Sequence, residues 1–340
     1  MKQIWIPRAG EPEVLELREA ADPLPAAGQV RIRVAAAGVN FADIVARMGL
    51  YPGLPPMPVV VGYEAAGSVD AVGNGVESDW LGREVLALTR FGAYSDTVCV
   101  PELQVFTLPS GMTAEEGAAL PVNYLTAYQL LEVMGGLRAG ETLLVHSAGG
   151  GVGIAAVQIA RRIGARIIGT ASAAKHDFLE SIGVDHCVDY RSEDFETRVR
   201  EITRGRGVEL AIDAVGGSSF KKSFRSLAPT GRLGMFGVSA VVTGKKRSIP
   251  GLVRATLATP WLQFTPSALM RGNKGVFGVS LGDLWEEMDR VWRWMEQLIA
   301  YYEEGDIRPV VAASFPFERA AEAHHYLQDR KNLGKVLLAP

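Results

Sequence analysis

Two patterns of apolar and polar positions divide the chain. Over its first third, short runs alternate polar and apolar residues, as in QVRIRVAA at 29–36, and VVVGYEAAGSVD at 59–70 has the same strand character. Alternation of this kind is typical of a strand with one buried face. A proline-rich loop, YPGLPPMP at 51–58, and the glycine turn VGNGV at 72–76 separate the runs. Many short strands punctuated by glycine turns predict a partly open β-barrel.

Helical signals follow this region. Thr113 begins the motif TAEE, a capping box in which the threonine and Glu116 satisfy the first amides of a helix. Pro121 is expected to end this helix. The run NYLTAYQLLEVM predicts a second helix that stops at the pair Gly135-Gly136.

From Glu141 onward, apolar runs alternate with helical segments at the spacing of βαβ units. Strands joined by crossover helices predict an α/β fold of the Rossmann type, with a doubly wound parallel sheet. The six strands are predicted at 142–146, 165–170, 186–190, 208–215, 232–237 and 275–280, with helices at 152–164, 175–182, 193–203 and 218–227.

The last part of the chain predicts an amphipathic helix at 284–303, the strand VVAASF, a helix at 318–328 and the strand GKVLLAP. We interpret this tail as the return of the chain to the first domain. Two domains are therefore expected, one formed by residues 1–122 and 271–340 and the other by residues 123–270.

Composition narrows the class of protein. The chain has 340 residues, 48% of them hydrophobic, and a net charge of −3. This balance argues against a nucleic-acid binder, which carries a basic excess, and against a disordered chain. The two cysteines, Cys99 and Cys187, are too few for a disulfide scaffold or a four-cysteine zinc lobe. Acids and prolines interrupt the N-terminal stretch where a secretory signal needs an apolar core, so we expect a cytoplasmic protein.

The strongest chemical motif is SAGGGVG at 147–153, between a predicted strand and a predicted helix. Small residues let the backbone approach a pyrophosphate, and the helix start presents amides to it. The alternative is a glycine turn selected for tight packing of the strand on the helix. We favour a dinucleotide site formed by Ser147, Ala148, Gly149, Gly150, Gly151, Val152 and Gly153. The same glycines argue against a membrane span over the uncharged stretch 142–160.

The end of the second strand indicates which dinucleotide is bound. An NAD site usually places an acid there for the ribose 2′-hydroxyl, but this sequence has Thr170, Ser172 and then Lys175. A small polar cup followed by a lysine suits a 2′-phosphate, so NADPH is the predicted cofactor. Tyr190 and Arg191 are expected on the adenine side. The alternative for Lys175 is a solvated lysine in the first turn of a helix.

The motifs AAAGVNFADIVARMGLYP (35–52), GYEAAG (62–67), LTAY (125–128) and NLGKVLL (332–338) resemble the medium-chain dehydrogenase/reductase superfamily. Within it, the chain resembles the zinc-independent, zeta-crystallin-like quinone oxidoreductases. HSAGGGVG, GTASAAKHD and GVSAVVTGKKRS are most similar to the vesicle amine transport protein homologue branch. The resemblance implies a GroES-like catalytic domain, a homodimer, and a cofactor in the cleft between the domains.

The resemblance also bears on metal binding. A zinc alcohol dehydrogenase would carry a cysteine near 38–40 and a His-Glu pair near 63–64, where this sequence has Asn40 and the pair Tyr63-Glu64. The histidines show no metal-ligand spacing with acids or cysteines, and His324 and His325 are expected on a helix surface. No metal is therefore predicted.

Several site residues are implied by the resemblance alone. Asn40 is expected near the nicotinamide ribose and the substrate, Tyr51 at a substrate carbonyl, and Asp43 as a support for Asn40 or the helix start. The alternatives are a turn-forming asparagine, a barrel cap and an ordinary first-turn acid. The other implied cofactor contacts are Thr126, Val215, Phe236, Gly237, Val238, Phe277, Val279 and Lys335, which would otherwise be core residues or, for Lys335, a surface lysine.

The predicted activity is hydride transfer from NADPH to a quinone, an activated enone or a 2-alkenal, since conjugation spreads the developing charge without a Lewis acid. One alternative is an enoyl-thioester reductase. Another is a lipid- or partner-binding protein that keeps NADPH binding with little turnover. The apolar segment 249–270 leaves three interpretations open, namely a lid, a dimer surface or a membrane contact, and its three prolines argue against a spanning helix.

Overall fold

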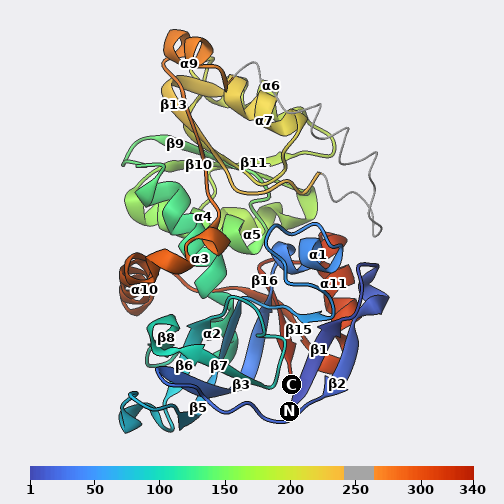
Figure 1. Cartoon of the computed structure of the whole chain (residues 1–340). Coiled ribbons are helices and arrows are strands. Elements are labelled where there is room, and N and C mark those ends of the chain that lie inside the picture. The colour runs from blue at the N-terminus through green and yellow to red at the C-terminus, as the bar shows by residue number, and fades with distance from the viewer. Residues whose placement is uncertain (241–263) are drawn as a thin grey trace. The chain divides into compact units, whose positions relative to one another are not determined.

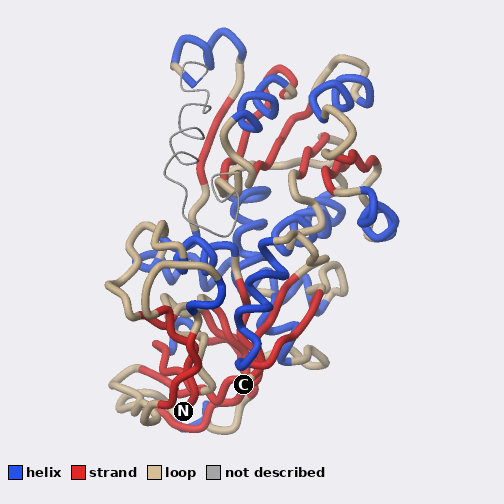
Figure 2. Tube along the Cα trace, turned by 90° about the vertical axis from the view of Figure 1, so that its right-hand side faces the viewer, coloured by secondary structure: helices blue, strands red, loops and turns tan. Residues whose placement is uncertain are grey.

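The structure is a computed structural model that describes residues 1–240 and 264–340. The chain forms two compact units (Figure 1). One unit, called the barrel unit here, comprises residues 1–125 and 282–340. The other, called the nucleotide unit, comprises residues 126–240 and 264–281 among the described residues. Both ends of the chain lie in the barrel unit (Figure 2).

The nucleotide unit is built on a six-stranded parallel sheet with the order β11-β10-β9-β12-β13-β14, which confirms the predicted doubly wound fold. Helices α4 and α5 cover one face of the sheet, and α6 and α7 cover the other (Figure 1). The strands are β9 Thr142–Val145, β10 Arg166–Ala171, β11 His186–Asp189, β12 Val208–Asp213, β13 Leu227–Met235 and β14 Gly275–Gly278. The helices are α4 Gly151–Ile163, α5 His176–Ser181, α6 Phe195–Ile202, α7 Ser218–Arg225 and α9 Pro266–Gly272.

The last strand corrects the expected domain boundary. A boundary at 270–271 would assign β14 to the barrel unit, but β14 pairs in parallel with β13, with Phe277 opposite Gly234. This pairing holds residues 264–281 in the nucleotide unit. Of the apolar segment 249–270, residues 249–263 lie outside the described residues, and the remainder leads into α9, whose first turn is capped by the Thr265 hydroxyl.

The barrel unit contains a sheet with the order β15-β16-β3-β5-β6-β8, in which β7 also pairs with β3, and a three-stranded sheet β2-β1-β4. The last strand, β16, lies antiparallel to β3, so the tail does return to the first domain. The strands are β1 Lys2–Ile6, β2 Glu16–Glu19, β3 Gln29–Val39, β4 Val59–Val60, β5 Glu64–Val72, β6 Glu84–Leu88, β7 Thr97–Pro101, β8 Val105–Thr107, β15 Val311–Pro316 and β16 Lys335–Ala339.

The run 59–70 is not one strand. It divides into β4 and β5, which belong to different sheets. Gly62 separates them with a φ of 101°. A Cβ atom at this position would lie 2.6 Å from the Tyr94 ring and 2.8 Å from its backbone nitrogen, so the break requires glycine.

The helices of the barrel unit follow the predicted caps. The Thr113 hydroxyl accepts the Glu116 amide at 3.1 Å, as the capping box predicts, and begins α2 Ala114–Ala119. Pro121 is the first residue of α3 Pro121–Tyr128, which leads into a π-helical turn at Gln129–Val133. Proline suits this first position because its missing amide has no partner there. The remaining helices are α1 Phe41–Arg47, α10 Met288–Glu303 and α11 Ala320–Gln328.

The expectation that His324 lies on a helix surface is wrong. His324 is fully buried on α11, with Nε2 at 3.1 Å from the Tyr94 hydroxyl and Nδ1 at 3.3 Å from Nη1 of Arg47. Burial, followed by the nearby charges of Arg47 and His325, lowers the pKa of His324 well below its ordinary value. The ring is therefore neutral at pH 7 and serves the core of the barrel unit.

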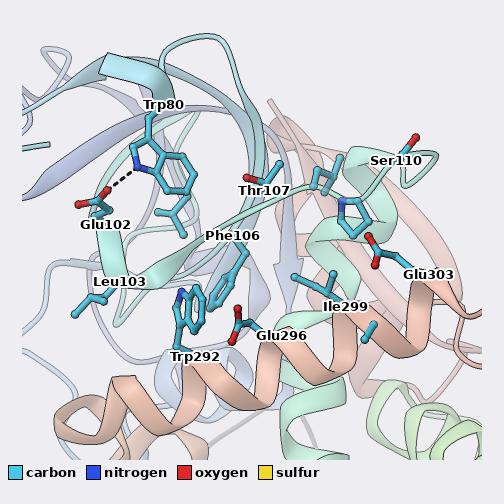
Figure 3. Close-up of a pocket in the computed structure, with 14 residues that line it drawn as sticks. Trp80, Glu102, Leu103, Phe106, Thr107, Ser110, Trp292, Glu296, Ile299 and Glu303 are labelled. Carbon is cyan, nitrogen blue, oxygen red and sulfur yellow. Dashed lines mark hydrogen bonds between the residues drawn. The ribbon is translucent and has the colours of Figure 1, made fainter. Parts of the chain in front are cut away.

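A pocket of about 670 Å³ lies beside α10 within the barrel unit (Figure 3). Trp292 stacks on Phe106 with ring centroids 6.0 Å apart, and Trp80 donates its indole N–H to Glu102 at 2.6 Å. The helix contributes Trp292, Glu296, Ile299, Ala300 and Glu303 to this pocket. Their spacing places them on one face of α10.

Candidate functional site

The turn after β9 has the geometry of a phosphate-binding turn. Ser147 adopts a φ of 55°, and the Gly150 amide donates to the Ser147 carbonyl at 2.8 Å, which closes the turn. A Cβ atom at Gly153 would lie 2.4 Å from the Ser147 carbonyl oxygen and 2.6 Å from that of Ala148. Only glycine permits this approach of the first turn of α4 to the loop.

The start of α4 presents amides that the helix itself does not use. The first intrahelical bond runs from the Ile154 amide to the Gly150 carbonyl at 2.9 Å. The amides of Gly151, Val152 and Gly153 precede it and have no partner within the helix. Together with the helix dipole, they form a local positive site that fits a pyrophosphate.

Next to this turn, buried polar side chains form a chain of hydrogen bonds. His146, which follows β9, contacts the Thr170 hydroxyl through Nδ1 at 3.0 Å and the Ser223 hydroxyl through Nε2 at 2.9 Å. Ser223 and Ser219 donate their hydroxyl protons to Asp213 Oδ2, each at 2.7 Å. Because the single Ser223 proton goes to Asp213, His146 Nε2–H donates to Ser223, and Thr170 donates to Nδ1. The chain ties together the carboxyl ends of β9, β10 and β12.

Burial lowers the pKa of His146, while the Asp213 charge opposes this shift. The imidazole is therefore neutral and acts as a relay of hydrogen bonds. Sequence reasoning did not assign His146 or Asp213 to the site. A polar residue at the end of a buried apolar strand was the available signal for both.

The predicted 2′-phosphate site, formed by Thr170, Ser172 and Lys175, is present only in part. Thr170 directs its hydroxyl inward to His146, so its side chain does not face that phosphate. Ser172 precedes a short 3₁₀ turn, Ala173–Lys175, which Lys175 ends, and both residues are half-buried. Tyr190 is 39% exposed after β11, and the Arg191 guanidinium lies 6.0 Å from its ring centroid. No acid occupies residues 170–175, and Lys175 is the one charged residue among them.

The ends of β12, β13 and β14 carry the other predicted cofactor residues of the sheet. The Val215 amide donates to Asp213 Oδ1 at 2.7 Å, and the Phe236 amide donates to the Asp213 carbonyl at 3.2 Å. Gly237 lies close to Ala214, and Val238 is 48% exposed. Phe277 packs on Gly234, Val279 is buried, and Thr126 is buried on α3. Asp213 thus shapes the loop that follows β12.

In the barrel unit, the structure brings together Asn40, Glu64 and Lys335, which are all buried. The Asn40 amide nitrogen donates to Glu64 Oε1 at 2.9 Å, and the Lys335 ammonium donates to Asn40 Oδ1 at 2.6 Å. Lys335 also forms an ion pair with Glu64 Oε1, and Glu64 Oε2 accepts the Val122 amide at 2.7 Å. The two partners fix the orientation of the Asn40 amide. Glu64 was missed as a site residue because its partners are distant in sequence.

Asp43 supports Asn40 from α1. Its carboxylate accepts the Asn40 backbone amide at 2.7 Å and the Gly62 amide at 3.0 Å. Complete burial raises the pKa of Asp43 to about 7, against the lowering effect of the Asn40 hydrogen bond. The carboxyl group therefore caps the helix start and changes charge near neutral pH.

Tyr51 belongs to an aromatic cluster in the same unit, formed by Tyr51, Tyr63 and Phe91. The ring centroids of Tyr51 and Tyr63 lie 5.6 Å apart, and those of Tyr63 and Phe91 lie 5.4 Å apart. Burial raises the pKa of the Tyr51 hydroxyl, although the ring is only half-buried. Tyr51 therefore stays a neutral hydrogen-bond donor at ordinary pH.

Two predictions concern a metal site and a membrane-spanning helix. Among residues 1–240 and 264–340, no group of three or more His, Cys, Asp or Glu side chains is placed to hold a metal ion. Within the same residues, no helix has both the length and the apolar character that a membrane crossing requires.

Comparison with known proteins places the chain in a family. Residues 182–338 match the zinc-binding dehydrogenase family, and residues 26–110 match the alcohol dehydrogenase GroES-like domain. The human synaptic vesicle membrane protein VAT-1 homolog is 43% identical over 329 residues, which cover 96% of this chain and 82% of that protein.

Solved structures share the whole fold. Escherichia coli quinone oxidoreductase complexed with NADPH aligns with a TM-score of 0.87 at 31% identity and covers 100% of both chains. The CurK enoyl reductase aligns with a TM-score of 0.84 at 28% identity and covers 99% of this chain and 98% of its own. The predicted resemblance is confirmed: the chain belongs to the medium-chain dehydrogenase/reductase superfamily of oxidoreductases, in the branch of the VAT-1 homologues and quinone oxidoreductases.

Proposed function

We propose that the protein is an NADPH-dependent, zinc-independent oxidoreductase that reduces quinones, activated enones or 2-alkenals. The observation that carries this proposal is the turn from Ser147 to Gly153, in which a missing Cβ at Gly153 lets the backbone of α4 approach two carbonyls. The turn and the free amides of α4 fit a pyrophosphate. When bound, NADPH supplies a hydride to the acceptor.

The choice of NADPH over NADH rests on charge. An NAD site needs a carboxylate for the ribose 2′-hydroxyl, and residues 170–175 contain none. Ser172 and Lys175 supply a hydroxyl and an ammonium instead, which suit a 2′-phosphate. The E. coli quinone oxidoreductase structure, by its description, contains NADPH, which supports the same choice.

Zinc independence rests on the residues at the expected ligand positions. Asn40 is held by Lys335 and Glu64, and Tyr63 is packed between aromatic rings, so neither position offers a thiolate or an imidazole. A conjugated acceptor needs less stabilisation than an alcohol, because its charge moves to a distant oxygen. We assign Asn40 and Tyr51 to hydrogen bonds with the acceptor or the nicotinamide ribose, and Asp43 to positioning Asn40.

The proposal includes a cytoplasmic homodimer. One alternative has a specific observation in its favour: the likeness to CurK enoyl reductase supports reduction of an enoyl thioester. Another follows from the VAT-1 homologues, whose name refers to a vesicle membrane, and would make the protein an NADPH-retaining binding protein.

The test is NADPH oxidation, followed at the reduced nicotinamide band, with a naphthoquinone, a 2-alkenal and a crotonyl thioester as acceptors. Turnover with the quinone or the alkenal is expected, and turnover with the thioester alone would support the enoyl reductase. The G153A variant, in which the new Cβ meets two carbonyls, should bind NADPH about 100-fold more weakly.

Two further variants complete this test. G150A, whose Cβ would lie 3.3 Å from a single carbonyl, should weaken NADPH binding less than about tenfold. K175E should reduce the preference for NADPH over NADH by about tenfold or more, because it removes a charge-assisted bond and adds repulsion. NADPH binding by the wild type without turnover on any acceptor would replace the proposal with the binding-protein alternative.

A further inference from the structure

The aromatic cluster contains a buried hydroxyl that the protein does not satisfy. Tyr63 is 6% exposed, and its hydroxyl has no hydrogen-bond partner among the described residues. Tyr51 lies beside Tyr63, with ring centroids 5.6 Å apart, and contributes to raising the pKa of Tyr63. Burying a hydroxyl without a partner has a desolvation cost, so native proteins rarely leave one in this state. An orphan of this kind indicates a group supplied from outside the chain.

The surroundings of Tyr63 fix its position. Asp43 is the carboxylate that acts on the Tyr63 hydroxyl, and its two oxygens accept the Asn40 and Gly62 amides. Gly62 precedes Tyr63 directly, so the two hydrogen bonds to Asp43 also fix the backbone from which the Tyr63 ring projects. The hydroxyl is thus rigidly placed and left unpaired.

The chemistry of the hydroxyl limits what it can bind. Burial, followed by the charges of Asp43 and Tyr51, raises the pKa of Tyr63 far above its ordinary value. The group therefore remains protonated and acts as a donor. The nearby carboxylate of Asp43 disfavours an anionic ligand. What remains is a neutral acceptor oxygen, such as a carbonyl.

The walls beside the hydroxyl favour a flat molecule. Tyr51 and Phe91 both lie against Tyr63, and the Tyr51 and Phe91 rings meet edge to face with centroids 6.5 Å apart. Aromatic rings prefer stacked or edge contacts with other conjugated systems. Because Tyr51 is only half-buried, the cluster is not closed on every side.

We propose that the Tyr63 hydroxyl donates a hydrogen bond to the carbonyl oxygen of a planar conjugated acceptor that packs against Tyr51 and Phe91. This inference rests on the proposed reductase function and adds a further substrate contact to it. The hydrogen bond strengthens as hydride addition moves charge onto the oxygen, so Tyr63 acts on the reacting group. No proton leaves Tyr63, and the proton that completes reduction comes from solvent.

The test compares Y63F with Y302F. Tyr302 is a matched control because it is a buried tyrosine of the same unit whose hydroxyl is paired, with Glu116 at 3.2 Å. In Y63F, kcat/KM for a naphthoquinone should fall about 10- to 100-fold, and NADPH affinity should stay within about twofold. Its melting temperature should not decrease, since an unpaired hydroxyl is removed. Y302F should melt earlier and keep its kcat/KM.

A direct binding measurement separates this inference from the proposed function. Naphthoquinone binding to the NADP⁺-loaded protein, followed by quenching of intrinsic fluorescence, should be about tenfold weaker in Y63F. If the wild type binds the quinone in this way but does not turn over, the reductase function fails and the Tyr63 contact stands. If the wild type turns over and Y63F matches it in kcat/KM and in quinone binding, the Tyr63 contact is wrong. A lower melting temperature for Y63F would also overturn it, because the hydroxyl would then have a partner within the chain.

Discussion

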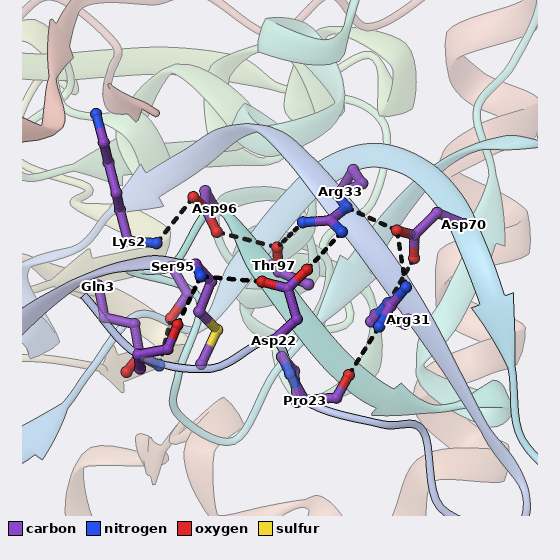
Figure 4. Close-up of polar contacts among 12 residues, drawn as sticks. Lys2, Gln3, Asp22, Pro23, Arg31, Arg33, Asp70, Ser95, Asp96 and Thr97 are labelled. Carbon is purple, nitrogen blue, oxygen red and sulfur yellow. Dashed lines mark hydrogen bonds and ion pairs between the residues drawn. The ribbon is translucent and has the colours of Figure 1, made fainter.

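The two ends of strand β3 carry two different networks of charge. Near its start, Arg31 and Arg33 contact Asp70 of β5 at 2.7 and 2.6 Å, and Arg33 also reaches Asp22 (Figure 4). Just beyond its end, Asn40 meets Glu64 of β5 and Lys335 of β16. Both networks join β3 to β5, yet the first lies at the surface and the second is buried.

The difference shows that burial, rather than the number of ion pairs, decides what a network does. Burial alone would raise the pKa of Asp70, but hydrogen bonds from Arg31 and Arg33 hold it below the ordinary value. Water still reaches these groups, so each pair contributes little to stability. In the buried network, each charge depends on its partner because water cannot replace it.

The largest effect is expected from K335M. This variant leaves the Glu64 carboxylate buried without its cation, which should lower the free energy of unfolding by about 3–5 kcal/mol. Urea denaturation measures this change, with K331M as the control because Lys331 is a 62% exposed surface lysine. A loss below about 1 kcal/mol would mean that Glu64 finds a proton or water, and the contrast between the two networks would be lost.

The double variant K335M/E64Q should recover about 1–3 kcal/mol of that loss. The glutamine that replaces Glu64 is neutral, and its side-chain oxygen can still accept the Val122 amide. Its side-chain nitrogen takes the place of Oε1, and it can donate to the Asn40 oxygen that Lys335 leaves once the Asn40 amide turns over. A double variant no more stable than K335M would show that the volume of the lysine side chain, and not its charge, holds the network.

A third network, Arg47–His324–Tyr94, is buried but contains a neutral imidazole. Its contribution to stability should therefore depend on pH. The folded protein keeps His324 unprotonated, because its pKa is lowered by burial, whereas the unfolded chain takes up a proton below about pH 6.5. The contribution of His324 to the free energy of unfolding should therefore fall as pH decreases from about 6.5, by up to about 1.4 kcal/mol per pH unit. Asp43 acts in the opposite direction, because its pKa is raised to about 7 in the folded protein, so the effect of His324 is the difference in slope between the wild type and a His324 variant.

The measurement is the slope of unfolding free energy between about pH 6.5 and 5. H324Q should make this slope less positive than that of the wild type, and H186Q, which changes an exposed histidine, serves as the control. An H324Q slope equal to that of the wild type would mean that His324 is not the group responsible.

The smallest effect is expected at the surface network. R33Q removes contacts with Asp70 and Asp22 but leaves Arg31 on Asp70, so the loss should stay below about 1 kcal/mol and shrink further in about 1 M salt. Thermal denaturation at low and high salt tests this. A loss as large as that of K335M would remove the distinction drawn from burial.

The features that could be predicted from sequence are local. The phosphate turn lies within seven consecutive residues, and the helix caps at Asn40 and Thr113 act over three. The six strands of the nucleotide unit were predicted from apolar runs that lie between turn residues. In each case the residues that determine the structure are neighbours in the chain.

What sequence reasoning missed is non-local. Lys335 and Glu64 are 271 residues apart, and neither carries a local sign of the other. His324 was misplaced because the expectation rested on the mixed burial of histidines in general and not on its position in the helix. It follows Ala320 and Ala323 at helical spacing, and all three are buried, so the period of α11 placed it in the core. Tyr63 needed the structure because an unpaired hydroxyl cannot be recognised without its surroundings.

The pairing of β16 with β3 has a consequence for the order of synthesis. Most of the nucleotide unit emerges from the ribosome as one stretch, and its described parts end at residue 281. The barrel unit instead keeps an open edge over residues 37–39 of β3, beyond the part that β7 pairs, and Glu64 lacks its cation, until residues 335–339 emerge. During translation, the first 125 residues are therefore a sheet with an unpaired edge, the form most exposed to aggregation and to capture by chaperones.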